Sequence, residues 1–281
     1  MPPLPSLSPL NLETALRAAS ARIGRLDARL LLEFVSGKTH AALITQAGEF
    51  LAPEQQARFL ALVERRAAGE PLAYLTGEAG FYGLAFTVTP AVLIPRPETE
   101  LLVESALAIS DALPPSAEIL DLGTGSGILA VTLAKCLPDA RVTAVDASAG
   151  AIEVARRNSE RHGVNVRFHQ GHWYAPLDAA RFDLIVSNPP YVAAGDPHLE
   201  RGGLPFEPRS ALTDGGDGLA CLREIIAGAP RHLHPGGMLF LEHGYDQAEA
   251  VRALLLQEGF REVRSQRDLN AIERVSGACW K

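Results

Sequence analysis

Two patterns of apolar residues divide the chain near residue 80. Before it, apolar residues recur every three or four positions and predict amphipathic helices, with one apolar face at Leu26, Leu30, Leu31, Phe34 and Val35 and another at Leu60, Val63 and Ala67. After it, short apolar runs alternate with helical segments, and residues 81–88 have the aromatic and β-branched content of a hairpin. We therefore expect an α/β protein with a helical domain over residues 1–80, a hairpin linker over 81–92 and a larger α/β domain over 93–281.

A glycine-rich turn follows the first predicted strand of the larger domain. The apolar run 117–122 predicts the strand, and the next five residues lead into a helical pattern at 128–134: Gly123, Thr124, Gly125, Ser126 and Gly127. Glycines at alternate positions allow a tight turn and the close approach of a ligand to bare backbone. A further strand at 141–145 delivers Asp146 about twenty residues after the glycines, where a carboxylate accepts the hydroxyls of a ribose.

The spacing of this turn bears on which nucleotide it would bind. A dinucleotide fingerprint runs Gly-x-Gly-x-x-Gly and serves a pyrophosphate at a helix N-terminus. Here the spacing is Gly-x-Gly-x-Gly, and Asp121 stands two residues before the first glycine. A carboxylate there suits a ligand with an ammonium and no phosphate, such as S-adenosylmethionine, although Asp121 could instead organise the loop.

A rigid polar turn ends the predicted strand at 182–187. It consists of Asn188, Pro189, Pro190 and Tyr191, and the carboxyl end of a strand is where open α/β sheets bind ligands. Proline restricts its own backbone and that of the residue before it. The Asn188 side-chain oxygen and the Pro189 carbonyl can then accept both hydrogens of one NH2 group, with the Tyr191 ring against its flat face. Taken alone, the same residues are also consistent with an ordinary proline-rich turn.

Together these motifs resemble class I S-adenosylmethionine-dependent methyltransferases that act on an NH2 nitrogen. Further stretches resemble the release factor glutamine methyltransferase family (PrmC/HemK), at residues 74–77, 81–84, 93–100, 206–208 and 273–275. The most specific is Ile-Pro-Arg-Pro-Glu-Thr-Glu at 94–100. The resemblance implies a Rossmann-like, mostly parallel seven-stranded sheet whose final strand is antiparallel. It also implies methylation of the side-chain amide nitrogen (N5) of the glutamine in the Gly-Gly-Gln motif of class 1 peptide chain release factors, with S-adenosyl-L-methionine as cosubstrate.

The resemblance also assigns roles to residues. The glycine turn 123–127, Asp146, Trp173 and Asn188 would bind the cofactor. Asn188, Pro189, Pro190 and Tyr191 would bind the substrate amide, with Asn188, Pro189 and Tyr191 catalytic; no general base is required. The helical domain would help to dock the release factor, unless it only caps the larger domain.

Two positions leave their roles open. His172 stands where relatives commonly carry an acid that accepts from the adenine amino group, so a neutral His172 or backbone groups would have to replace that contact. The segment 196–217 has few apolar residues and directly follows the substrate motif, which is typical of a substrate-binding loop. Its Glu207 would either meet the substrate or order the loop.

Composition bears on which substrates other than a release factor fit this chain. N6-adenine methylation of nucleic acid would suit the same turn, but a net charge of −7 and arginines spread along the chain disfavour a phosphate-binding surface. Glutamine methylation of a ribosomal protein stays open, as does a binding protein that has lost catalysis. No apolar run reaches the roughly 18 residues of a membrane span, and the start lacks the basic region of a signal peptide, so we expect no membrane association and a cytoplasmic location.

Cysteine and histidine spacing indicates no metal. The 3 cysteines form no Cys-x-x-Cys pair, so neither a disulfide framework nor a zinc site is expected, and we expect reduced, buried thiols. The 8 histidines show no metal spacing with Asp or Glu. His232 and His234 flank a Pro-Gly-Gly turn and are predicted to lie at the surface.

Overall fold

The computed structural model describes residues 9–281. They form two compact units, divided between Gly77 and Glu78. The predicted boundary at residue 80 therefore falls inside the first strand, β1 (Glu78–Phe81), which pairs with β2 (Leu84–Thr87) as an antiparallel hairpin. This hairpin is not a separate linker. Phe81 and Phe86 are buried in a hydrophobic cluster of the second unit, so the hairpin belongs to that unit.

Over residues 9–77, the regular elements of the first unit are all helices, apart from an isolated bridge between Asn11 and Phe50. Its helices are α1 (Leu12–Ile23), α2 (Arg25–Ser36), α3 (His40–Thr45), α4 (Pro53–Ala67) and α5 (Leu72–Thr76). The Asn11 side chain caps α1 by accepting from Thr14 N at 2.9 Å. Pro53 begins α4, where its missing N–H costs nothing.

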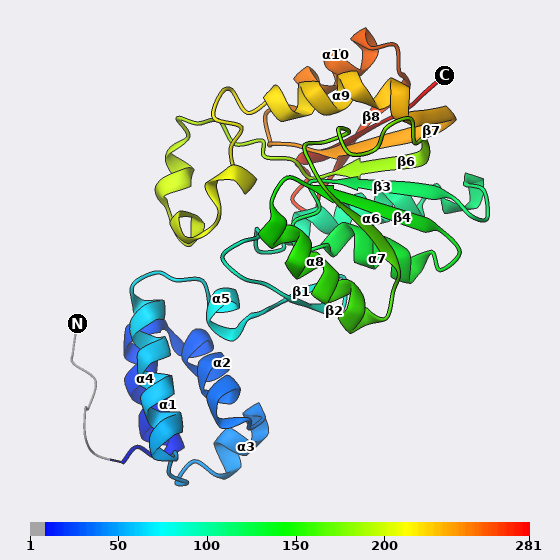
Figure 1. The fold of residues 1–281 in the computed structure, drawn as a ribbon. Helices are drawn as coiled ribbons and strands as arrows, with labels where there is room; N and C mark the ends of the chain where they lie inside the picture. The colour runs from blue at the N-terminus through cyan, green and yellow to red at the C-terminus, as the bar shows by residue number, and fades with distance from the viewer. Residues whose placement is uncertain (1–8) are drawn as a thin grey trace. The chain divides into compact units, whose positions relative to one another are not determined.

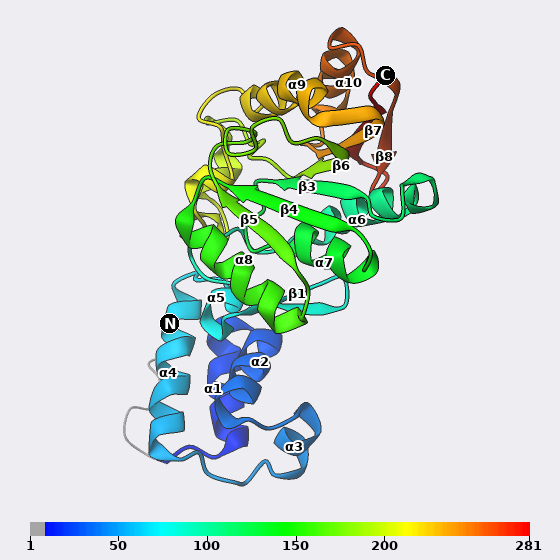
Figure 2. The same cartoon turned by 45° about the vertical axis from the view of Figure 1, so that its right-hand side comes forward.

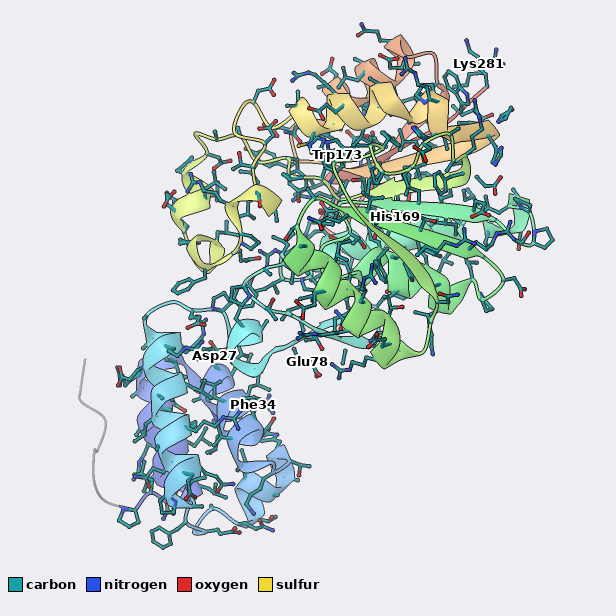
Figure 3. The ribbon with its side chains drawn as sticks, viewed as in Figure 1. Asp27, Phe34, Glu78, His169, Trp173 and Lys281 are labelled. Atoms are coloured by element: carbon teal, nitrogen blue, oxygen red, sulfur yellow. The ribbon has the colours of Figure 1, made fainter. Side chains whose placement is uncertain are left out.

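The buried face of α2 differs from the predicted one. It consists of Ala28, Leu31, Leu32 and Val35, whereas Leu26 is 60% exposed and Phe34 (labelled in Figure 3) lies at the surface with Arg58 over its ring. Apolar residues occur on more than one side of this helix, so spacing alone does not identify the side that packs. The prediction was therefore wrong for Leu26 and Phe34 and correct for Leu31 and Val35.

The second unit is built on a seven-stranded sheet of order β5-β4-β3-β6-β7-β9-β8 (Figure 1). Its strands are β3 (Glu118–Leu122), β4 (Arg141–Asp146), β5 (Val166–Gln170), β6 (Phe182–Ser187), β7 (Leu233–Glu242), β8 (Arg261–Arg267) and β9 (Glu273–Cys279). The first five strands in this order are parallel, and β9 runs antiparallel to both β7 and β8. The predicted mostly parallel sheet with an antiparallel final strand is confirmed.

Helices cover both faces of this sheet. They are α6 (Glu100–Leu107), α7 (Ile128–Cys136), α8 (Ala149–His162), α9 (Ala220–His232) and α10 (Ala248–Gln257), with short 3-10 helices η1 (Pro97–Thr99), η2 (Ser110–Ala112), η3 (Pro197–Glu200), η4 (Leu204–Phe206) and η5 (Arg209–Ala211). Along β3, Ile119 packs with α6 and α7, while Leu120 and Leu122 pack with α9 and α10. In Figures 1 and 2, α9 and α10 lie on one side of the sheet and α7 and α8 on the other. The alternation of side chains along each strand thus supplies both hydrophobic layers.

The strand order reverses between β3 and β6. From β3 the chain continues outward through β4 and β5, and it then returns to place β6 on the other side of β3. Such a switch point leaves a crevice beyond the carboxyl ends of the two central strands. The glycine turn follows β3, Asp146 ends β4 and Asn188 follows β6, so the topology brings the predicted motifs to one edge.

Other expectations have mixed outcomes. His232 is buried, contrary to the surface prediction, because its ring stacks on Tyr174 with centroids 4.6 Å apart and its Nδ1 lies 2.9 Å from the Ala180 carbonyl. His234 is partly buried.

The cysteines are free, but Cys136 is exposed and the other two are partly exposed, so the prediction of buried thiols was wrong. Across residues 9–281, no helix has the length and apolarity needed to cross a membrane.

Candidate active site

A cavity of about 350 Å³ opens at this edge of the sheet. Most of the predicted site residues line it, namely Gly123, Thr124, Gly125, Ser126, Asp146, Trp173, Asn188 and Pro190. Gly127, Pro189 and Tyr191 lie beside it without lining it. The volume is within the range typical of small-molecule sites.

The glycine turn needs its glycines for steric reasons. Gly123 has φ 73°, and a Cβ there would lie 3.3 Å from the Trp173 ring. Gly127 has φ 83°, and a Cβ there would lie 3.1 Å from the Cβ of Ala155 on α8. Both positions therefore combine a left-handed backbone with close packing that a side chain would disturb. The Asn158 side chain, also on α8, donates to the Ser126 carbonyl at 2.8 Å and fixes the turn from behind.

Asp146 is held at the rim of the cavity by backbone donors. Its Oδ2 accepts from Gly125 N at 2.9 Å and its Oδ1 from Ser148 N at 2.8 Å. Burial raises the pKa of this carboxyl, and the two backbone hydrogen bonds act in the opposite direction. The two oxygens are thereby oriented, and each carboxylate oxygen can accept more than one hydrogen bond.

Asp121 organises the loop and does not line the cavity. It is fully buried, and its Oδ2 accepts from Thr124 Oγ1 at 2.6 Å and from Ala130 N at 3.2 Å. Burial raises the pKa of Asp121 to about 7, against the effect of these two hydrogen bonds. Of the two roles that the sequence left open, these contacts support the structural one.

Trp173 and His172 border the cavity on the segment after β5. Trp173 (labelled in Figure 3) has φ 45°, and its Nε1 is buried without a hydrogen-bond partner among the described residues. The His172 side chain is mostly exposed, with Nδ1 3.6 Å from Glu224 Oε2. Trp173 lines the cavity, and the contact of its ring with an adenine stays a prediction.

The Asn188 side chain has a defined hydrogen bond inside the protein. Its Nδ2 donates to Thr99 Oγ1 at 3.0 Å. Thr99 ends η1 and is fully buried. Because the amide group is planar, its oxygen is turned away from Thr99. Asn188 lines the cavity, and the role of its oxygen as an acceptor for the substrate stays a prediction.

Tyr191 points toward the protein interior. Its hydroxyl donates to Glu242 Oε1 at 3.0 Å, and its ring packs against the hydrophobic cluster beneath α9 and α10. Its carbonyl accepts from Gln247 Nε2 at 2.9 Å. These contacts fix the turn, while the contact of the Tyr191 ring with a substrate amide stays a prediction.

Sequence reasoning did not identify Glu242, Gln247 or the role of Thr99. Burial raises the pKa of Glu242 to about 7, and the negative charge of Glu98 acts in the same direction. The side chains of Thr99 and Tyr191 and the positive charge of Arg274 act in the opposite direction. One signal was available. Glu242 directly follows the apolar residues 238–241 at the end of β7, and a carboxylate at the carboxyl end of a buried strand lies at the ligand edge.

Glu207 clasps the long loop onto the segment before η1. It is buried, its Oε2 accepts from Ile94 N at 2.9 Å and its Oε1 accepts from Arg96 Nη2 at 2.5 Å. Residues on both sides of this clasp line the cavity, including Leu93 and Ala211. Glu207 therefore orders the loop, which is one of its two predicted roles.

Comparisons with known proteins indicate the family of the chain. A family model described as the methyltransferase small domain matches residues 98–202, and one described as the PrmC N-terminal domain matches residues 11–77. A release factor glutamine methyltransferase of Burkholderia pseudomallei is 54% identical over 96% of this chain and 96% of its own length. The protein of the same name from Bordetella pertussis is 53% identical over 92% of this chain and 96% of its own length.

The chain belongs to the release factor glutamine methyltransferase family. Its α/β unit also resembles a solved structure, the Thermus thermophilus 16S rRNA N2 G1207 methyltransferase (RsmC) in complex with AdoMet and guanosine. The TM-score is 0.53 at 24% identity, covering 73% of this chain and 50% of that one. This likeness supports the fold, and the family membership makes the chain an S-adenosylmethionine-dependent methyltransferase. Within residues 9–281, no group of three or more His, Cys, Asp or Glu side chains is placed to hold a metal ion.

Proposed function

We propose that this protein transfers a methyl group from S-adenosylmethionine to the side-chain amide nitrogen of the glutamine in the Gly-Gly-Gln motif of class 1 peptide chain release factors. The observation that carries the proposal is the orientation of Asn188. Its amide nitrogen is bound to Thr99, which leaves its oxygen to accept from an NH2 group in the cavity. The names of the relatives support the choice of substrate, and a substrate of the translation machinery implies action in the cytoplasm.

The cavity lining fits S-adenosylmethionine. Asp146 offers oriented oxygens to the ribose hydroxyls, the bare glycine turn allows close approach, and Trp173 offers a ring to the adenine face. When bound, S-adenosylmethionine supplies an electrophilic methyl group on a sulfonium. No metal enters the proposal, because neither the binding nor the transfer requires one.

The residues of the turn would assist a weak nucleophile. An amide nitrogen shares its lone pair with the carbonyl, in the resonance that gives a peptide bond its rotation barrier of about 18–20 kcal/mol. In the proposed complex, Asn188 Oδ1 and the Pro189 carbonyl accept the two N–H hydrogens, while Pro190 and Tyr191 confine the amide plane. These hydrogens become more acidic as the nitrogen gives up its lone pair, so both hydrogen bonds strengthen in the transition state. Holding the nitrogen roughly 3–3.5 Å from the methyl carbon and in line supplies the remaining assistance. In the proposed transfer, the N–C bond would form as the S–C bond breaks, S-adenosylhomocysteine would leave, and the nitrogen would release one of its two N–H protons to solvent.

The helical unit is proposed to help to bind the release factor. Among residues 9–77, the exposed large apolar residues are Leu26, Phe34, Ile44 and Phe50. Exposed apolar side chains of this size are available for contact with a partner protein. Recognition of a glutamine within a folded protein requires contacts beyond the cavity, which this unit is proposed to supply.

Mass spectrometry tests the function directly. An unmethylated release factor is incubated with this protein and S-adenosylmethionine, beside a factor whose Gly-Gly-Gln glutamine is replaced and beside the Asn188→Ala variant. We expect one added methyl group, located on that glutamine, and none in either control. Methylation of a ribosomal protein or of adenine in nucleic acid, with the release factor unchanged, would refute the proposal.

A further inference from the structure

We propose that Gln247 is a positioning residue that holds the end of the Asn-Pro-Pro-Tyr turn in place for methyl transfer. Gln247 directly precedes α10, and its side chain contacts the turn at Tyr191 without lining the cavity. The proposal rests on the proposed function, since it concerns how firmly the turn presents its acceptors to the substrate NH2 group. It assigns a role in the reaction to a residue that does not touch the substrate.

The Gln247 side chain is hydrogen-bonded to backbone groups at both of its polar atoms. Its Oε1 accepts from Gly244 N at 2.8 Å, and its Nε2 donates to the carbonyls of Tyr191 at 2.9 Å and Gly218 at 3.2 Å. A backbone N–H only donates and a carbonyl only accepts, so these partners fix which side of the amide carries the oxygen. The orientation of Gln247 therefore depends on the protonation state of no other group.

The two prolines make the turn dependent on contacts at Tyr191. They have no backbone N–H, so after Asn188 a backbone donor can anchor the turn only from Tyr191 onward. The proposed function also reserves the Pro189 carbonyl for the substrate. Tyr191 is held at its hydroxyl by Glu242 and at its carbonyl by Gln247. Both partners lie at or just after the end of β7, so one segment fixes the residue that closes the turn.

The segment before α9 closes on the same carbonyl. Gly218 has φ 81°, and a Cβ there would lie 2.3 Å from the Tyr191 carbonyl oxygen and 2.9 Å from Gln247 Nε2. Only glycine therefore fits at this point. The Gly218 N–H donates to Asp214 Oδ1 at 3.0 Å, and Asp214 lines the cavity. Gln247 thus joins the turn to a second segment that borders the cavity.

Burial makes the hydrogen bonds of Gln247 hard to replace. Gln247 is 9% exposed and Gly218 is buried, so a carbonyl that loses the Gln247 donor stays unpaired unless the backbone moves. In-line transfer is sensitive to such movement, since a displacement of about 1 Å can slow a reaction about 100-fold. The proposed cofactor contacts, at Asp146 and the glycine turn, lie on other segments. Gln247 should therefore affect the rate of transfer more than the binding of the cofactor.

The test compares Gln247→Met with Gln257→Met. Methionine has nearly the length of glutamine but no N–H donor, and Gln257 is an exposed residue at the end of α10. We expect Gln247→Met to lower kcat for release factor methylation about 10- to 100-fold, with the calorimetric Kd for S-adenosylmethionine changed less than about threefold. Gln257→Met should keep both quantities within about threefold of the parent. An unchanged kcat in Gln247→Met, or a loss of cofactor binding as large as the loss of kcat, overturns the proposal.

A second measurement needs no substrate. The sequence contains one Tyr-Val pair, Tyr191-Val192, so carbonyl-¹³C tyrosine and ¹⁵N valine labels give a single correlation between the Tyr191 carbonyl carbon and the Val192 N–H. Loss of the hydrogen bond should move this carbonyl signal to lower frequency in Gln247→Met but not in Gln257→Met. An unmoved signal in Gln247→Met overturns the proposal whatever the substrate. Conversely, if the parent methylates no release factor, the proposed function fails while the carbonyl signal still decides whether Gln247 holds Tyr191.

The methionine side chain could disturb the turn by its own shape. Gln247→Ala removes the same donor and leaves no bulk against the Tyr191 carbonyl, so it must show the same loss of kcat and the same movement of the carbonyl signal. A folded Gln247→Ala protein with the kcat or the carbonyl signal of the parent would also overturn the proposal.

Discussion

Replacing Glu242 by glutamine should remove a pH-dependent loss of stability. Glu242 is fully buried at the end of β7, and burial raises its pKa from the ordinary value of 4.5 to about 7. The folded protein therefore holds this proton more tightly than the unfolded chain does. Stability from this group is greatest below about pH 4.5 and decreases as the pH rises through about 7. Glutamine has the same size and remains neutral throughout.

The magnitude follows from the shift of about 2.5 pKa units between 4.5 and about 7. One unit corresponds to about 1.4 kcal/mol, so the ionised group costs about 3 kcal/mol of folding free energy above pH 8. Between about pH 5.5 and pH 8.5 the difference in unfolding free energy, variant minus parent, should increase by about 2 kcal/mol. Asp121 also has a pKa raised by burial, but it is present in both proteins and cancels in the difference.

Urea unfolding followed by tryptophan fluorescence measures this difference. Both tryptophans, Trp173 and Trp280, lie in the α/β unit, so the signal reports on the unit that contains Glu242. Glu249→Gln, at an exposed position on α10, is the matched control and should give no such pH dependence. Parallel curves for the Glu242→Gln protein and the parent over this pH range would refute the reasoning.

Three further predictions concern binding and loop order. Asp146→Asn should weaken S-adenosylmethionine binding roughly 10- to 100-fold by calorimetry, because hydrogen bonds to a charged group are lost; an unchanged Kd would remove Asp146 from the site. Glu207→Ala should speed limited proteolysis of the loop after the Asn-Pro-Pro-Tyr turn roughly 5- to 100-fold, because the hydrogen bonds of the Glu207 carboxylate are lost. Equal rates of cleavage in the variant and the parent would show that Glu207 does not order the loop. Leu26→Ser with Ile44→Ser should raise KM for whole release factor severalfold but not for a short glutamine peptide. The equally exposed Leu256→Ser on α10 is the control, and an equal effect on both substrates would contradict docking by the helical unit.

Much of the local structure could be predicted because local signals set it. The strand predicted at 182–187 has the same bounds as β6, and the helical pattern predicted at 128–134 begins at the same residue as α7. Strand β7 begins at Leu233, ahead of the Pro-Gly-Gly sequence, because Leu233 pairs with Phe182 across an irregularity in the sheet. The Pro-Gly-Gly sequence within β7 indicates a turn when it is considered without that partner.

The sequence by itself determined the ligand edge of this protein. Glycines that permit a left-handed turn, an acid at a strand end and prolines that restrict a turn are local properties, and parallel strands bring their carboxyl ends together. Tertiary structure decided which buried polar atoms meet. Asn188 and Thr99 are 89 residues apart, Glu207 and Arg96 are 111 apart, and Tyr191 and Glu242 are 51 apart. No local pattern encodes such pairs, because a hydrogen bond depends on an approach of about 3 Å between segments that only the packed sheet and its helices bring together.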